Sequence, residues 1–156
     1  MQKHYVLFAI VTLIISCSEK TKNGPDMSAT TSIEGTWKLL TGTIIEKGDT
    51  TITDYTKDKS FIKVINDSHF AFLLHDLSKG KDSSSAAFSA GGGSYSLTGN
   101  KYTEHLEYCN AREWEGHDFS FTITFSGDTL IQSGVEKIEA QGIDRINIEK
   151  YIKVKD

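Results

Sequence analysis

The segment Lys101–Cys109 carries the densest set of side chains that could do chemistry. Successive side chains of an extended strand point to opposite faces. One face of this segment carries Tyr102, Glu104, Leu106 and Tyr108. The set is large and mostly apolar, so we expect it to face the interior of the protein. A carboxylate in a dry interior must be paired or protonated. Glu104 is therefore expected either to fix the polar part of a ligand or to pair with an internal Arg or Lys.

The opposite face of the same segment predicts no metal site, although it carries His105, Glu107 and Cys109. Alternate residues of a strand lie roughly 6.6–6.8 Å apart. Three such residues cannot converge on one ion with bonds of about 2.0–2.3 Å. His69 and His75 lie at the two ends of another expected strand and are also too far apart. We expect neither a metal nor a cofactor.

The sequence offers no catalytic constellation. The glycine run 91–93 lacks the Lys-Ser/Thr that ends a phosphate-binding loop and the strand–turn–helix setting of a dinucleotide site. Gly92, Ser94 and Ser96 miss the glycine that closes a nucleophile elbow. We therefore expect a protein that is not an enzyme. The enzymatic alternative has Glu104 as a general base.

The elements that must position these residues are strands. Phe119, Phe121, Ile123 and Phe125 alternate with Ser and Thr, which is the period of a strand with one dry face. We expect this dry face to line a cavity together with Tyr95 and the inward residues of Lys101–Cys109.

The chain as a whole predicts an all-β fold of about nine short strands. Turn sequences at 46–49, 66–68, 99–100 and 126–128 separate the alternating segments. Sequential hairpins form an antiparallel up-and-down meander, and closure of such a meander removes its exposed edges. We expect an eight- to ten-stranded barrel, which is wide enough to hold a small ligand. The expected strands are 36–45, 50–55, 61–65, 69–75, 94–97, 101–109, 119–125, 129–131 and 146–154.

Two connecting segments could serve a function. The segment 78–93, rich in Ser and Gly, is expected to be a long hairpin loop that either only connects two strands or covers the barrel mouth with Phe88 as a plug. Trp114 lies in the charged segment 110–117 and is expected either to tuck over the barrel end or to be exposed for a partner.

Composition limits the class of partner. The 156 residues carry a formal net charge of −4, and loss of Lys3 with residues 1–16 makes it −5. Nucleic-acid binding needs a basic face, so we expect no nucleic-acid partner. Aromatic residues make up 10% of the chain, which argues against disorder.

The N-terminus predicts export. A basic start and a short apolar run over residues 1–16 have the layout of a secretory signal. Ile14-Ile15-Ser16-Cys17 resembles the lipobox of bacterial lipoproteins. That resemblance implies cleavage before Cys17, acylation with chains such as palmitate, and anchoring in the cell envelope. We expect a signal peptide at 1–16, a lipidated cysteine and flexible tether at 17–32, and a barrel domain at 33–156.

The segment Gly35-Thr36-Trp37 resembles the first strand of the lipocalin and fatty-acid-binding superfamily. Further segments resemble a lipocalin-like domain family of Bacteroidetes exported proteins: 93–95, 99–108, 116–117, 127–130 and 149–154. The resemblance implies a calycin-type barrel and an outer-membrane lipoprotein that faces the periplasm or the cell surface. It also implies that Trp37 plugs the closed end, under a cation from the last strand. Arg145, Lys150 and Lys153 are all candidates for that cation.

These observations predict a membrane-anchored binding protein for a small apolar or amphipathic molecule. The expected cavity residues are Tyr95, Tyr102, Glu104, Leu106, Tyr108, Phe119, Phe121, Ile123 and Phe125. The alternative is a structural or protein-interaction lipoprotein whose barrel is filled by its own side chains and which acts through its loops.

Overall fold

The computed structural model describes residues 32–155 of the chain. The predicted signal peptide, the predicted lipidation site Cys17 and nearly all of the predicted tether lie outside these residues. Within them, alternation of apolar and polar residues produces strands. Phe119, Phe121 and Ile123 point inward and are at most 5% exposed, whereas the intervening Ser and Thr side chains are exposed.

Nine strands follow one another in an antiparallel meander. The pairing of β1 with β9 closes the sheet, which confirms the predicted all-β barrel. Two three-residue 3-10 helices, η1 (Arg112–Trp114) and η2 (Glu139–Gln141), are the helical segments of the described part and are far too short to form a membrane span. The strands are β1 (Gly35–Glu46), β2 (Asp49–Asp54), β3 (Lys59–Ile65), β4 (His69–Asp76), β5 (Phe88–Thr98), β6 (Lys101–Cys109), β7 (His117–Ser126), β8 (Thr129–Ile138) and β9 (Ile143–Lys153).

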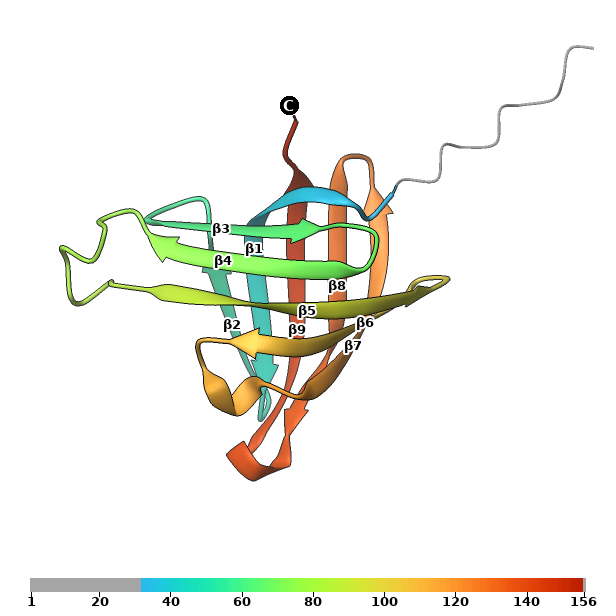
Figure 1. Cartoon of the computed structure of the whole chain (residues 1–156). Helices are drawn as coiled ribbons and strands as arrows, with labels where there is room; N and C mark the ends of the chain where they lie inside the picture. Colours follow the sequence, from blue (N-terminus) through green and yellow to red (C-terminus); the bar gives the residue numbers. More distant parts are fainter. Residues whose placement is uncertain (1–31, 156) are drawn as a thin grey trace, which may run out of the picture. The chain divides into compact units, whose positions relative to one another are not determined.

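The barrel has eight strands, and β2 is an extra strand outside it. The first part of β1, Gly35 to Lys38, pairs with β3, whereas the part from Thr41 to Glu46 pairs with β2. Strand β9 pairs along nearly all of β1. In Figure 1, strands β3 to β6 cross steeply over β1, β8 and β9, so the two groups of strands enclose the core between them.

One end of the barrel is sealed by Trp37, which is fully buried. Its indole Nε1 donates a hydrogen bond to the Ile33 carbonyl oxygen at 2.6 Å. The ammonium of Lys153 lies 5.3 Å from the ring centroid of Trp37. Lys153 is therefore the cation of the last strand that lies over the Trp37 ring. Of the other two candidates, Lys150 is exposed and Arg145 lies against Trp114.

A β-bulge in β6 changes which side chains face the interior. Leu106 pairs with Gly93 and Tyr108 pairs with the adjacent Gly92, so β6 contains one extra residue, Glu107. The bulge reverses the alternation after Leu106. The predicted inward position of Tyr108 is wrong, because its side chain is 68% exposed. Cys109 is buried, as expected for a lone cysteine, although strict alternation would place it on the opposite face.

Glycine permits the close approach of β5 to β6 at this bulge. A Cβ atom on Gly93 would lie 1.9 Å from the His105 carbonyl oxygen. The carboxylate of Glu107 accepts two hydrogen bonds from Ser94, one from the backbone N–H at 3.0 Å and one from the side-chain hydroxyl at 2.7 Å. The glycines at 91–93 thus belong to strand β5 and not to the expected loop.

The connection between β4 and β5 is shorter than expected and is tied to Asp76. The Asp76 carboxylate accepts hydrogen bonds from the Ser78 hydroxyl at 2.6 Å and from the N–H groups of Gly80 and Ala87. These bonds hold the pKa of Asp76 well below its usual range, with the Ser78 hydroxyl contributing most. Phe88 begins β5 and is 68% exposed, so it does not plug the barrel.

Candidate functional site

The barrel contains a cavity of about 340 Å³, and Trp37 is not part of its lining. Its apolar wall combines residues from β3, β4, β6, η1 and β7, because the inward faces of these strands converge there. Its polar wall comes mainly from β8 and β9. The apolar wall consists of Phe61, Phe72, Leu106, Trp114, Phe119 and Phe121. The polar side chains are Lys63, Glu104, Gln132, Glu136, Arg145, Asn147 and Glu149.

A buried ion pair between Lys63 and Glu104 crosses the interior. Their Nζ and Oε1 atoms lie 2.5 Å apart, and the side chains are only 3% and 10% exposed. The same ammonium donates a hydrogen bond to Oε1 of Gln132 at 3.1 Å. Strands β3, β6 and β8 each supply one member of this group. The expected alternative in which an internal lysine satisfies Glu104 is therefore the arrangement observed.

The electrostatics of this pair depend on its burial. Burial alone would lower the pKa of Lys63, but the surrounding carboxylates, Glu104 foremost, outweigh that effect and hold the pKa above its usual range. Burial raises the pKa of Glu104, and the nearby Lys63 opposes that rise. Lys63 consequently stays protonated at neutral pH, and its charge is committed to Glu104.

A second polar group also lines the cavity. The Arg145 guanidinium donates to one Glu136 oxygen through Nε at 2.7 Å, and the Asn147 amide donates to the other at 2.8 Å. Arg145 also stacks on Trp114, with its guanidinium carbon 5.0 Å from the ring centroid. Trp114 also packs against Phe119. It therefore lies over the barrel end, which is one of the two arrangements expected from the sequence.

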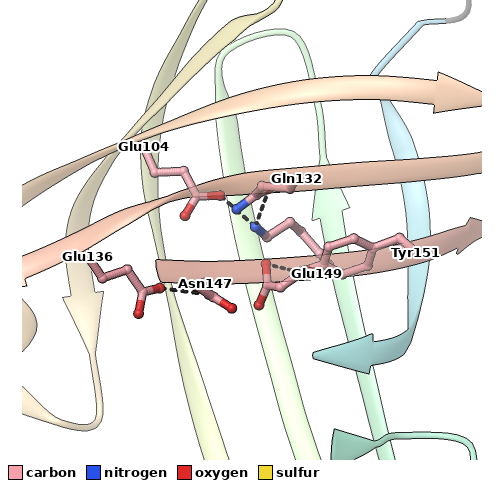
Figure 2. A network of polar contacts seen from close by, with 7 residues as sticks. Glu104, Gln132, Glu136, Asn147, Glu149 and Tyr151 are labelled. Atoms are coloured by element: carbon pink, nitrogen blue, oxygen red, sulfur yellow. Dashed lines mark hydrogen bonds and ion pairs between the residues drawn. The ribbon is translucent and has the colours of Figure 1, made fainter. Parts of the chain in front are cut away.

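Glu149 is the third carboxylate of the cavity, and within residues 32–155 it has no ion-pair partner. Its Oε2 accepts a hydrogen bond from the Tyr151 hydroxyl at 2.7 Å. Figure 2 shows this contact beside the Glu136–Asn147 contact and the Glu104 and Gln132 side chains. Burial, followed by the negative charge of Glu149, raises the pKa of Tyr55. The pKa of Tyr151 is raised by the same two causes.

Tyr102 carries an unusual hydroxyl group. Among the described residues it is the one buried side-chain polar atom without a hydrogen-bond partner. Burial, followed by the charge of Glu104, raises its pKa far above the usual range. The Tyr102 ring packs against Tyr95 with centroids 5.2 Å apart. Tyr102 therefore stays a neutral phenol next to the Lys63–Glu104 pair.

The structure brings only some of the predicted cavity residues to the cavity wall. Glu104, Leu106, Phe119 and Phe121 line it. The other predicted residues lie elsewhere. Tyr102 and Ile123 are buried in the surrounding core, and Tyr108 faces outward. The Tyr95 hydroxyl donates a hydrogen bond to the Asn66 carbonyl oxygen, and Phe125 packs on Trp37.

Sequence reasoning missed most of the polar wall. In β9 the isoleucines at 146, 148 and 152 form the more apolar set, yet Ile146 and Ile152 are exposed and the polar alternate residues point inward. Hydrophobic alternation alone would therefore indicate the wrong inward face for β9. One signal for Lys63 existed: it shares its face with Phe61 and Ile65, which is an unusual position for a lysine.

The described residues contain no group of three His, Cys, Asp or Glu side chains placed to hold a metal ion. Cys109 lines the cavity as a free thiol. No family model matches the chain, and no curated protein matches it. The closed eight-stranded antiparallel barrel is compatible with a calycin-type fold.

Proposed function

We propose that the barrel binds a small, partly apolar molecule in its interior. The observation that carries this proposal is the cavity of about 340 Å³ with an aromatic wall on one side and a polar wall on the other. Small-molecule sites are mostly apolar hollows of about 300–1,000 Å³ with a few placed polar groups. A barrel filled by its own side chains, the alternative considered from sequence, would not leave such a space.

We also propose that the protein is a non-enzymatic lipoprotein of the cell envelope, anchored through Cys17 and carrying a lipocalin-like barrel. The basis for this part is the sequence of residues 1–17. Two acyl chains are sufficient for stable membrane anchoring. Intact-mass analysis of protein purified from its host membrane tests it, because acylation at Cys17 adds a defined mass. A mature N-terminus that carries no acyl group would contradict the anchor.

A fluorescence assay tests ligand binding. The predicted mature chain, residues 17–156 with Cys17→Ser, is titrated with N-phenyl-1-naphthylamine, an uncharged dye whose emission rises in apolar surroundings. We expect saturable binding with one site per chain.

Two variants on β5 identify the site of the dye. Ser89 lines the cavity, whereas Ser96 lies on the same strand with an exposed side chain. Ser89→Trp should therefore abolish dye binding and Ser96→Trp should preserve it. Equal binding by both folded variants would place the dye outside the cavity and contradict the proposal.

A further inference from the structure

We infer that the cavity selects an organic cation: an apolar molecule that carries a protonated amine. This inference rests on the proposed function, since it specifies the ligand of the same cavity. It follows from the charges of the cavity wall and from the aromatic rings near the carboxylate without an ion-pair partner.

The fixed charges of the cavity wall do not cancel. Its lining includes three carboxylates, Glu104, Glu136 and Glu149, but only two cations, Lys63 and Arg145. Lys63 lies 2.5 Å from Glu104 and Arg145 lies 2.7 Å from Glu136. These two pairs are internally neutral. One negative charge remains in the cavity, and it belongs to Glu149.

The surroundings of Glu149 suit a cation better than an anion. Its carboxylate receives one neutral hydrogen bond, from Tyr151, which leaves its other oxygen for a ligand. A carboxylate or phosphate ligand would meet an unbalanced negative charge, and both neighbouring cations already have carboxylate partners. A protonated amine would supply the missing counter-charge and donate a charge-assisted hydrogen bond, which is stronger than a neutral one.

Three aromatic rings that pack in series lie near this carboxylate. Tyr55, whose titration is affected by Glu149, packs edge-on against Phe61 with centroids 5.8 Å apart. Phe61 in turn lies 6.3 Å from the ring of Tyr151. Aromatic faces attract ammonium groups, and the attraction increases where water is excluded. Glu149 and these rings together form a site for an alkylammonium group.

The position of Tyr55 depends on a glycine. Gly42 pairs with Glu149 across β1 and β9, and a Cβ atom on Gly42 would lie 3.1 Å from the Tyr55 ring. The ring therefore lies directly over the backbone next to Glu149. The apolar wall formed by Phe72, Trp114 and Phe119 would receive the apolar body of the ligand.

A series of three similar probes tests the inference by calorimetry at pH 7. Phenylethylammonium is cationic, 2-phenylethanol is neutral and phenylacetate is anionic, and all three carry the same ring. We expect the cation to bind at least about tenfold more tightly than the alcohol, a difference of about 1.4 kcal/mol. We expect phenylacetate to bind most weakly.

Two variants assign the preference to Glu149. Glu149→Gln keeps the shape of the side chain and should weaken binding of the cation about tenfold, while binding of the alcohol changes less than about twofold. Glu139→Gln removes the same charge from a side chain that is 83% exposed and should change neither. A cation preference that persists in a folded Glu149→Gln variant would overturn the assignment.

The outcomes separate this inference from the proposed function. If the alcohol or phenylacetate binds the wild-type chain as tightly as the cation, the inferred charge selection is wrong and the binding cavity stands. If none of the three probes binds and the uncharged dye also fails to bind, both are wrong. The wild-type ranking decides the question even where Glu149→Gln fails to fold.

Discussion

Replacement of Lys63 by Met is the sharpest test of the polar interior. The substitution keeps an unbranched side chain of similar length and removes its charge. We expect the free energy of unfolding at pH 7 to fall by about 3–5 kcal/mol, because Glu104 would be left buried without a counter-charge. For a domain of this size that loss lowers the melting temperature by roughly 10–25 °C.

The magnitude follows from the geometry of the pair. At the observed separation of 2.5 Å, the attraction is about 7 kcal/mol at an effective dielectric constant of about 20. Removing each ion from water costs several kcal/mol, so the intact pair contributes little net stability. Deleting one partner keeps the cost for the other. Gln132 also loses the donor to its Oε1, which accounts for about 1–3 kcal/mol of the expected loss if no water replaces it.

The double variant Lys63→Met/Glu104→Met isolates the cost of the unpaired charge. An apolar pair of similar volume is often neutral or stabilising relative to a buried ion pair. We therefore expect the double variant to recover most of the lost stability and to retain only the deficit at Gln132. As a control, Lys150→Met removes an exposed lysine from β9 and should change the stability by less than about 0.5 kcal/mol.

The defect of the single variant should depend on pH in a defined direction. Burial raises the pKa of Glu104, and Lys63 opposes that rise. Without Lys63 the folded-state pKa of Glu104 rises further above its unfolded value of 4.5. A raised folded pKa favours the folded state below the unfolded value, and that benefit is lost as pH rises through the folded pKa. The single variant should thus be least impaired near pH 4 and most impaired above neutrality.

Urea unfolding followed by circular dichroism, at pH 4 and at pH 8, measures all four proteins. The reasoning is refuted if Lys63→Met costs less than about 1 kcal/mol at pH 8, because that is well below the loss expected for an unpaired buried charge. It is equally refuted if the deficit does not shrink at pH 4, or if the double variant is no more stable than the single one.

Three further outcomes are expected. Lys153→Met should lower the free energy of unfolding by about 0.5–2 kcal/mol in thermal melts, because it removes the cation from the indole ring that seals the barrel. Asp76→Ala should speed proteolysis of the β4–β5 loop at neutral pH, because the loop loses its hydrogen bonds to the Asp76 carboxylate. These bonds lower the pKa of Asp76 in the folded protein. In the wild type, the protection against proteolysis should therefore be present above the ordinary pKa of 3.8 and be lost as pH falls through the folded pKa. Gly93→Ala should cost about 3 kcal/mol in urea unfolding, because its Cβ would lie 1.9 Å from the His105 carbonyl oxygen, whereas Ser96→Ala on the same strand should cost little.

The strands were predictable because their information is local. The alternation of Phe119, Phe121 and Ile123 with Ser and Thr is sufficient to define a half-buried strand. Turn sequences then fix the order of the hairpins, and closure follows from the need to pair both edges of the sheet. The inward direction of Glu104 was predicted in the same way, since it shares a face with Tyr102 and Leu106 on the regular part of β6.

The cavity residues were predictable only where a strand stays regular. Tyr108 was placed inside because strict alternation was assumed, but the extra residue at Glu107 reverses the faces. That bulge depends on Gly93, which allows β5 to approach β6 closely, and the pairing of two strands cannot be read from one of them. The polar face of β9 was missed because hydrophobic alternation assigns the apolar side chains of a strand to the interior. In this barrel the interior holds charged side chains, so the polar face of β9 points inward.

The sequence by itself determined the element types, their order and the closed meander, since alternation and turns are properties of neighbouring residues. Tertiary structure alone decided that Lys63, Glu104 and Gln132 meet, and that Glu149 is left without a counter-charge within the described residues. These groups come from β3, β6, β8 and β9, and their distances depend on register and barrel closure. The charge balance of the cavity is therefore a property of how four strands are brought together.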